Sequence, residues 1–559
     1  MKTKSTLLAI VLNLFSCFAI AQQMVKDIAP GYNTSYPLGF CINNGIVFFA
    51  ADDKVNGTEL WKTNGTTIGT VMVKNINTTG SGVYFTDGEI VSLGGNVYFE
   101  GDDGVNGGEL WKSDGTETGT VMVKDLRTGP LGCNIESIFE FNGALYFKAH
   151  DGINGAELWK SDGTSAGTIM VNDILPGQYD GLTSNPFEFV KFNNMLYFTA
   201  RDNTGSSPTL WKTDGTGSGT TKVVTSKIKF ALEPKSLTEY NGNLYFNAYT
   251  IDTNGNNIGG TELYKTDGTD AGTVLLKDIY PANYKSSYPQ NLTVANNLLF
   301  FIADDGVQGR ELWKTNGSPS GTVIVKDIYV GSNTGPYYNQ GEKMAVINNN
   351  LFFVANDGIS GDELWKSDGT AINTIMIKDI RSGNASSIDP NHELFVINGY
   401  AYFSAHNGTL GYEIWKSDGT AIGTTLVKDI MPPGYTSSSS SDPAGFTNNN
   451  GVLYFTANNG LNGRELWKYN PTLGVNENYK DDLGITVYPN PSKGIISLEL
   501  TDLKEAELSI YNVAGQKALT KKINEIKSKL DLSTFDNGIY FLNFKNNDGT
   551  TVKKIILDK

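Results

Sequence analysis

The chain has 559 residues, which is more than one ordinary domain usually holds. Its composition is 39% hydrophobic, 11% aromatic and only 18% charged, with 63 glycines, and this favours a turn-rich β-protein. The net charge of −15 at pH 7 would repel nucleic-acid phosphates and anionic lipid, so we expect no nucleic-acid partner.

The N-terminus has the pattern of a secretory signal peptide. MKTK is basic, the stretch LLAIVLNLFSCFAIA is apolar, and small residues precede Gln22. We therefore predict that residues 1–21 are removed by cleavage between Ala21 and Gln22. The apolar run is short for a transmembrane helix, and no second candidate follows it, so no membrane span is expected in the mature chain.

One short phrase recurs along most of the chain and contains every tryptophan. Residues 155–168 give one copy, GAELWKSDGTSAGT, and its core ELWKSDGT is also found unchanged at 109–116 and 363–370. The copies are spaced 48 to 53 residues apart, so the sequence contains nine units of about 50 residues. The aromatic residues of the copies are, in order, Trp61, Trp111, Trp159, Trp211, Tyr264, Trp313, Trp365, Trp415 and Trp467.

Each unit has the pattern of four short β-strands. In the unit that starts near residue 139, the apolar runs FEF and ALYFKA flank Asn142-Gly143, which is a strong hairpin signal because both turn residues need a positive φ. AELWKS and TIMVNDI follow as two more strands, with a turn at Asp162-Gly163 between them. The unit shows no helical periodicity.

Repeated four-stranded units predict the blades of a β-propeller. Leu158 and Trp159 put apolar side chains on both faces of a strand, as a sheet packed between two neighbours requires. The last unit stops at Lys468 without its VKDI strand, which residues 24–28 supply. We therefore predict an all-β fold with a nine-bladed propeller closed by its termini over residues 22–468. Two smaller rings or an open solenoid are the alternatives.

The nine copies resemble the ELWxxDGT repeat family of exported bacterial proteins, and the resemblance covers about residues 24–468. That family is defined by its repeat and not by a reaction. The resemblance therefore implies export but indicates no activity. Because the phrase is nearly the same in every copy, we interpret it as the part that builds the fold, with Trp159 as a wedge between neighbouring blades.

A linker over residues 469–484 leads to a second predicted domain, a small β-sandwich over residues 485–559. This segment resembles the type IX secretion C-terminal sorting domain of Bacteroidetes. The resemblance implies passage across the outer membrane, contact with the type IX secretion machinery, and either release or attachment at the cell surface. The matching residues include Tyr488, Pro489, Asn490, Pro491, Tyr511, Asn512 and Gly515.

No catalytic constellation is apparent in the sequence. Only three histidines occur, and His150 and His406 share a turn position that carries Asp or Asn in other copies, which indicates local capping. Cys41 and Cys133 could pair in an exported protein, but their different offsets within their units favour two separate thiols. We expect a protein that is not an enzyme.

Acidic turns offer a possible calcium site. Asp102, Asp103 and Glu109 in DDGVNGGEL are hard oxygen ligands close together in sequence. The spacing is not that of an EF-hand, and Asp-Gly turn chemistry explains the acidic residues better. We therefore expect no cofactor, with structural Ca²⁺ as the alternative.

The long loops that follow the VKDI-like strands are the most site-like feature. They leave from the same edge of each unit, so a closed ring would gather them on one face. Tyrosine offers a flat apolar ring and a hydroxyl, which suits glycan or protein binding. The candidate binding residues are Tyr32, Tyr36, Tyr284, Tyr288, Tyr337, Tyr338 and Tyr435.

The function predicted from these observations is that of an exported, non-enzymatic protein at the cell surface or outside the cell, binding a glycan or a protein. A polysaccharide-acting enzyme is one alternative, and its unique residues would be sought in the irregular stretch 221–262. A Ca²⁺-stabilised structural surface protein is the other.

Overall fold

The computed structural model places the chain in two compact units, Ala21–Pro471 and a C-terminal unit that includes Thr472–Lys559. We call the first unit the repeat domain. The structure describes residues 22–83, 90–177, 189–202, 208–223, 228–229, 237–251, 257–282, 285–331, 344–388, 393–431, 440–471, 485–500, 506–512, 517–546 and 549–559.

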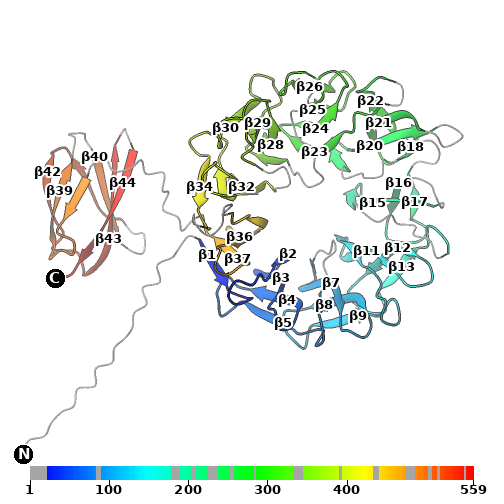
Figure 1. Cartoon of the computed structure of the whole chain (residues 1–559), viewed down its shortest axis with the longest axis horizontal. Coiled ribbons are helices and arrows are strands. Elements are labelled where there is room, and N and C mark those ends of the chain that lie inside the picture. The colour runs from blue at the N-terminus through cyan, green and yellow to red at the C-terminus, as the bar shows by residue number, and fades with distance from the viewer. Residues whose placement is uncertain are drawn as a thin grey trace, which may run out of the picture. The chain divides into compact units, whose positions relative to one another are not determined.

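The repeat domain is built from antiparallel sheets (Figure 1), and no helix occurs among the described residues. Its first strands are β1 (Gln22–Lys26), β2 (Leu38–Asn43), β3 (Ile46–Asp52), β4 (Thr58–Thr63), β5 (Val71–Lys74), β6 (Val91–Leu93), β7 (Asn96–Asp102), β8 (Gly108–Ser113), β9 (Val121–Lys124), β10 (Glu136–Phe141), β11 (Ala144–His150), β12 (Ala156–Ser161) and β13 (Ile169–Asn172). The next are β14 (Val190–Phe192), β15 (Met195–Ala200), β16 (Thr209–Thr213), β17 (Thr221–Lys222), β18 (Ile228–Lys229), β19 (Thr238–Tyr240), β20 (Asn243–Ile251), β21 (Asn257–Thr266) and β22 (Val274–Lys277). The last are β23 (Gln290–Ala295), β24 (Leu298–Asp304), β25 (Arg310–Thr315), β26 (Val323–Lys326), β27 (Ala345–Ile347), β28 (Asn350–Asn356), β29 (Asp362–Ser367), β30 (Ile375–Lys378), β31 (Phe395–Ile397), β32 (Tyr400–Ala405), β33 (Glu413–Ser417), β34 (Thr425–Lys428), β35 (Ala444–Asn449), β36 (Val452–Asn458) and β37 (Arg464–Tyr469).

These strands form nine sheets among the described residues, so the predicted all-β fold of four-stranded units is confirmed. Within a sheet, consecutive strands pair in order, as in β10-β11-β12-β13. Asn142 and Gly143 have φ of 50° and 78°, which is the hairpin geometry predicted from the sequence. One sheet differs from the prediction, since β18 pairs with β20 and gives it a fifth strand.

One sheet is assembled from the two ends of the repeat domain. β1 pairs antiparallel with β37, and the order of strands is β1-β37-β36-β35. The pairing partners include Gln22 with Tyr469 and Met24 with Trp467. Figure 1 shows the sheets following one another in chain order, with β1 beside β37 and the last sheet beside β2.

The apolar core lies between neighbouring sheets. Leu158 packs with Trp211 of the following sheet, whereas Trp159 packs with Tyr98 and Leu110 of the preceding sheet. Two consecutive residues of one strand therefore face opposite neighbours, as the two-residue period of a strand requires. The same arrangement recurs with Trp111, which packs against Phe48 and Leu60.

The polar residues of the repeated phrase tie the same elements together. Glu157 is buried and accepts backbone hydrogen bonds from Ile174 (2.9 Å) and Leu175 (3.2 Å) in the loop that leaves its sheet. Lys160 Nζ donates to the carbonyl oxygen of Gly215 in the next sheet, at 2.6 Å. In the Glu-Leu-Trp-Lys order, the glutamate therefore caps a loop and the lysine bonds to the next sheet. The leucine and the tryptophan enter the cores on opposite sides of their own sheet.

The C-terminal unit contains two antiparallel sheets around one core, formed mainly by leucine and isoleucine. Its strands are β38 (Ile485–Tyr488), β39 (Ile495–Leu500), β40 (Ala506–Asn512), β41 (Lys517–Ile523), β42 (Lys527–Asp531), β43 (Gly538–Asn546) and β44 (Gly549–Leu557). The sheet orders are β38-β39-β42 and β41-β40-β43-β44. In the part of the chain that the structure describes, no helix is long and apolar enough to cross a membrane.

Candidate functional site

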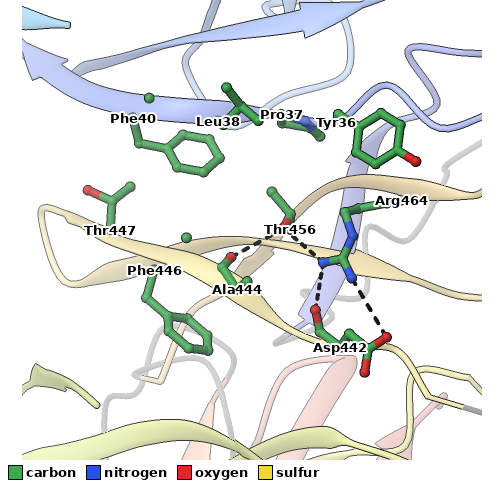
Figure 2. Close-up of a pocket in the computed structure, with 12 residues that line it drawn as sticks. Tyr36, Pro37, Leu38, Phe40, Asp442, Ala444, Phe446, Thr447, Thr456 and Arg464 are labelled. Carbon is green, nitrogen blue, oxygen red and sulfur yellow. Dashed lines mark hydrogen bonds and ion pairs between the residues drawn. The ribbon is translucent and has the colours of Figure 1, made fainter. Parts of the chain in front are cut away.

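A cavity of about 470 Å³ lies where the first and last sheets of the repeat domain meet. It is lined by residues that precede and begin β2 and β35, together with one residue each from β36 and β37 (Figure 2). Its volume falls in the range of roughly 300–1,000 Å³ that is typical of small-ligand sites. We call it the β2–β35 pocket.

The two walls of the pocket come from equivalent segments of neighbouring units. Tyr36 and Asp442 each follow a buried serine, and both have a left-handed backbone, with φ of 46° and 43°. A tyrosine with positive φ is rare, but here the conformation belongs to the repeat, since Asn134 and Tyr288 adopt it at other junctions. Three residues further on, Gly39 (φ 68°) and Gly445 (φ 64°) occupy the same bulge in β2 and β35.

A side chain at the bulge glycine of β35 would crowd the opposite wall. A Cβ on Gly445 would lie 3.2 Å from the ring of Phe40, on the opposite wall. Phe40 and Phe446 follow the two glycines (Figure 2). Phe40 is half-buried, whereas the ring of Phe446 is buried against Phe395 and Phe455 in the core beside the preceding sheet. The pocket is therefore lined by the backbone of two glycines and by half-buried Phe40.

Arg464 is the cationic group of the pocket. Its Nη1 donates to the carbonyl oxygen of Asp442 (2.6 Å) and to Thr456 Oγ1 (3.2 Å). Its Nη2 lies 3.9 Å from Asp442 Oδ2, which is too far for a direct hydrogen bond. Burial lowers the pKa of the Arg464 guanidinium, and the nearby Asp442 carboxylate opposes that shift.

The loop that carries Tyr36 is fixed to both sheets by Ser35. Ser35 Oγ donates to Glu465 Oε2 at 2.6 Å, and its backbone N–H donates to the Arg464 carbonyl at 3.1 Å. The Ser35 carbonyl accepts from the N–H of Asp52 in β3 at 2.9 Å. Glu465 is fully buried, and this burial raises its pKa to about 7.

Three of the seven candidate tyrosines lie in the described residues. Tyr32, Tyr36 and Tyr288 are 80%, 58% and 48% exposed, but only Tyr36 lines the pocket. Tyr288 has the same φ of 46° before β23, at another junction, and Tyr32 is not among the lining residues. The four that lie outside the described residues are Tyr284, Tyr337, Tyr338 and Tyr435.

The candidate calcium ligands serve the local backbone. Asp103 Oδ1 accepts from the N–H groups of Val105 and Asn106, both at 2.9 Å, whereas buried Glu109 accepts from Leu126 N–H (2.7 Å) in a different loop. Asp102 accepts from Gly104 N–H at 2.6 Å. The described residues contain no group of three or more His, Cys, Asp or Glu side chains arranged to hold a metal ion.

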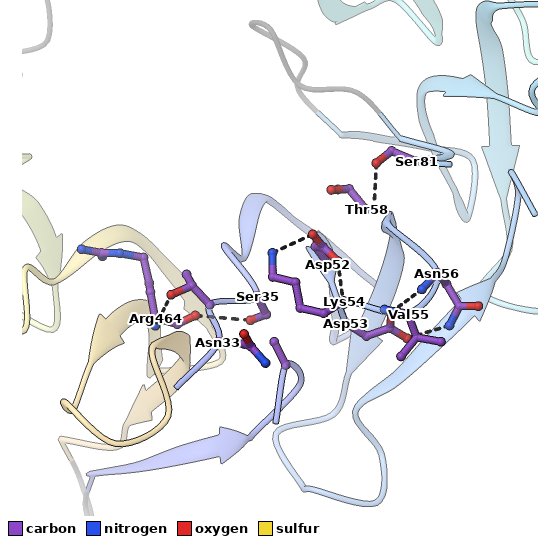
Figure 3. A network of polar contacts seen from close by, with 12 residues as sticks. Asn33, Ser35, Asp52, Asp53, Lys54, Val55, Asn56, Thr58, Ser81 and Arg464 are labelled. Atoms are coloured by element: carbon purple, nitrogen blue, oxygen red, sulfur yellow. Dashed lines mark hydrogen bonds and ion pairs between the residues drawn. The ribbon is translucent and has the colours of Figure 1, made fainter. Parts of the chain in front are cut away.

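The equivalent turn at Asp52 and Asp53 adjoins the candidate site, and its polar contacts are shown in Figure 3. Asp53 Oδ1 accepts from the N–H groups of Val55 (2.9 Å) and Asn56 (2.7 Å). Asp52 forms an ion pair of 2.7 Å with Lys54, whose Nζ also lies 5.6 Å from the centre of the Tyr36 ring. These carboxylates are therefore engaged in shaping the turn.

The described histidines cap turns, and the two cysteines of the repeat domain are buried. His150 Nδ1 and His406 Nδ1 each accept from a glycine N–H two residues ahead, at 2.7 Å, which is the predicted capping role. His392 lies outside the described residues. Cys41 and Cys133 are free and buried, and burial raises the pKa of the Cys41 thiol to about 11.

Arg464, Asp442 and the paired glycines were not predicted from the sequence. One signal was available, because the residue before the glutamate of the phrase differs between copies. It is threonine at 58, glycine at 108 and arginine at 310 and 464. Differences between copies mark the places where a repeat protein can build a unique site.

The C-terminal unit provides the decisive comparison. Residues 486–558 match the family described as secretion system C-terminal sorting domain. This segment is a type IX secretion sorting domain. It implies contact with the type IX secretion machinery and secretion to the outer cell surface or the extracellular space.

The motif residues of the sorting domain lie at strand ends. Tyr488 ends β38 and its hydroxyl donates to Glu499 Oε2 at 3.2 Å, and Asn490 Oδ1 accepts from Ile556 N–H at 2.8 Å. Pro489 and Pro491 both follow cis peptide bonds. Tyr511 and Asn512 end β40, whereas Ala21 and Gly515 lie outside the described residues.

Several solved structures are distantly similar to the chain. PorZ, a bacterial surface component of the type IX secretion system of Porphyromonas gingivalis, is 12% identical with a TM-score of 0.26, over 93% of this chain and 81% of that chain. A puromycin-hydrolysing peptidase of Mycobacterium tuberculosis is 11% identical with a TM-score of 0.36, over 78% and 60%. Prolyl oligopeptidase B of Galerina marginata is 12% identical with a TM-score of 0.33, over 68% and 57%.

All three TM-scores are below 0.5, so these likenesses do not indicate the function of this chain. The chain spans less than two thirds of the length of both peptidases. No curated protein matches the sequence.

Proposed function

We propose that the chain is an exported, non-enzymatic binding protein whose repeat domain is a single nine-bladed β-propeller closed by its ends. The pairing of β1 with β37 supports closure, and so does the core cluster in which Val25 and Leu466 pack with Trp61 of the first complete sheet. In this proposal residues 1–21 are a signal peptide, and the sorting domain directs the second step of export.

The proposed ligand is a glycan or a segment of polypeptide, and it binds in the β2–β35 pocket. The observation that carries this assignment is the meeting of exposed Tyr36 with Asp442 and Arg464 in one cavity. Small-molecule sites combine apolar surface with a few convergent polar groups, and this pocket has both. We propose ligand binding at this sheet junction alone.

The binding assignment is tested with Tyr36→Ala. The full-length protein would be screened on arrays of glycans and of peptides, and the variant is expected to lose roughly tenfold or more in affinity for whatever binds, because Tyr36 supplies aromatic contact area. Tyr288→Ala is the matched control, since Tyr288 has the same backbone conformation and similar exposure at another junction. Equal loss in both variants, or in neither, would reject the pocket.

The export assignment has its own test. Removal of residues 486–558 is expected to keep the protein from reaching the cell surface and the medium, because the sorting domain is absent. Cell fractionation with an antibody against the repeat domain would measure this. Normal secretion of the truncated protein would contradict the assignment.

A further inference from the structure

The polar groups of the β2–β35 pocket form an incomplete pair. Asp442 Oδ2 and Arg464 Nη2 are 3.9 Å apart, and hydrogen bonds between nitrogen and oxygen are normally no longer than about 3.2 Å. The other terminal nitrogen, Nη1, is already held by the Asp442 carbonyl and Thr456. The side chain is thus anchored through one nitrogen, and the second faces the carboxylate without reaching it.

Both members of this pair are accessible from solvent. The side chain of Asp442 is 47% exposed and that of Arg464 is 23% exposed. Figure 2 shows them together at one end of the pocket, with Tyr36 above Arg464 in that view. A ligand that enters the pocket therefore meets an acceptor and a donor side by side.

Two neighbouring hydroxyl groups match this pair. One hydroxyl donates to Asp442 Oδ2, and the adjacent hydroxyl accepts from Arg464 Nη2. A hydroxyl both donates and accepts, so a vicinal diol serves a carboxylate and a guanidinium at the same time. The hydrogen bonds are made to charged groups, which are the stronger kind.

The rest of the pocket suits a sugar ring. Tyr36 offers an exposed aromatic face, and half-buried Phe40 lies beside the backbone of the two glycines. Aromatic rings pack well against flat C–H surfaces. The two glycines carry no side chain of their own, so their backbone lines the pocket directly.

The charge of the protein selects against an acidic ligand. The net charge is −15, Asp442 lines the pocket, and Asp52 donates its N–H to the carbonyl of Ser35, the residue before Tyr36. Nearby Lys54 is already paired with Asp52 at 2.7 Å. A polyanion would therefore be repelled on approach, whereas an uncharged ligand would not.

We propose that the β2–β35 pocket binds a neutral saccharide through two vicinal hydroxyls, held by Asp442 and Arg464, with Tyr36 against the apolar face of the ring. This inference rests on the proposed binding function and narrows it to one ligand class. A peptide and an acidic polysaccharide are the competing ligands that the experiment separates.

The experiment uses the full-length protein on an array that carries neutral oligosaccharides, acidic oligosaccharides and peptides. Neutral oligosaccharides are expected to bind. Asp442→Asn and Arg464→Gln are each expected to weaken that binding by roughly tenfold or more, because each removes the charge that strengthens its hydrogen bond. Asparagine adopts positive φ readily, so Asp442→Asn keeps the backbone of the wall.

Arg310→Gln is the matched control, because Arg310 also precedes the glutamate of its phrase and lies outside the pocket. It should leave affinity unchanged. Melting curves of each variant verify folding. Raising NaCl from about 0.05 to about 0.5 M should change affinity by less than about twofold, since the ligand carries no charge.

The results distinguish a failure of the neutral-saccharide assignment from a failure of the proposed binding function. Neutral-saccharide binding that survives both Asp442→Asn and Arg464→Gln would overturn the diol assignment and leave a binding protein. If the protein binds acidic saccharides or peptides more tightly than neutral saccharides, the proposed ligand class is wrong, but the protein is still a binding protein. If nothing on the array binds, the proposed binding function itself fails.

Discussion

The hydroxyl of Ser35 donates a 2.6 Å hydrogen bond to Glu465, although 430 residues separate the two in sequence. The same contact occurs inside the chain, where Ser387 donates to Glu363 at 2.5 Å over 24 residues. The junction between the first and last sheets is therefore built with the same local chemistry as an ordinary junction between consecutive units.

Loss of this hydroxyl should weaken the repeat domain measurably. Ser35→Ala removes the side-chain donor to buried Glu465. Two backbone donors remain, Ile28 N–H at 3.0 Å and Ala29 N–H at 3.2 Å. A cost of about 1–3 kcal/mol is expected for a buried charged group that loses one donor. Chemical denaturation of Ser35→Ala and Ser387→Ala would measure it. An unchanged denaturation midpoint in both variants would show that the serines contribute nothing.

The tryptophan of the phrase should contribute through its size rather than its N–H group. Trp159 is 7% exposed and its Nε1 is buried without a hydrogen-bond partner among the described residues. Trp159→Ala is expected to cost about 3–5 kcal/mol, because it leaves a large cavity between two sheets. Trp159→Phe keeps most of the volume and should cost clearly less. Thermal unfolding compares them, and equal losses would contradict this explanation.

The buried glutamates should make stability depend on pH. Burial raises the pKa to about 7 in Glu59, Glu262, Glu363, Glu413 and Glu465. The ordinary value is 4.5, so between these values the folded protein holds protons that the unfolded chain has released. This contribution to stability is fully present below about pH 4.5 and is lost as the pH rises through about 7.

Melting temperatures measured between about pH 4.5 and pH 8 test this dependence. The wild-type protein should lose stability as the pH rises across this range. Glu363→Gln cannot titrate, so its melting temperature should fall less steeply than that of the wild-type protein. A melting temperature that rises with pH, or parallel curves for the two proteins, would rule out these glutamates as the cause.

The glycine of the Asp-Gly turn should be restricted by a neighbouring sheet as well as by its backbone. Gly163 has φ of 86°, and a Cβ there would collide with the hydroxyl of Tyr98. Gly143 has a similar φ of 78° but open space around it, so it separates the two effects. Gly143→Ala should cost about 1–2 kcal/mol from backbone strain. Gly163→Ala should cost about 1–3 kcal/mol more from overpacking, as judged by denaturation.

The repeating part of the fold could be predicted because each signal is local. The apolar alternation, Asn142-Gly143 and Asp162-Gly163 determine strands and turns within a few residues of themselves. The division of Leu158 and Trp159 between two faces follows from the strand period alone. These features needed no knowledge of the neighbouring units.

The pocket could not be predicted because its parts come from opposite ends of the repeat domain. Tyr36 was singled out for its chemistry, and the predicted closure brings its unit beside the last one, but no local signal marks Asp442 and Arg464 as its neighbours. The serines that hold the loops also vary in spacing, since Ser387 lies 24 residues after its glutamate and Ser441 lies 28 residues after. A motif with fixed spacing would miss them.

The assembly of one sheet from both ends has a consequence for the order of events in the cell. β1 is the first strand of the repeat domain to be synthesised, and its partner β37 is the last. Every other sheet can pair as soon as its own stretch of chain exists, but β1 has to wait for nearly the whole domain. Contacts so distant in sequence form slowly. The unpaired edge of β37 is therefore the last one of the domain to be covered, and the time until β1 arrives is the period in which a strand from another molecule can take its place.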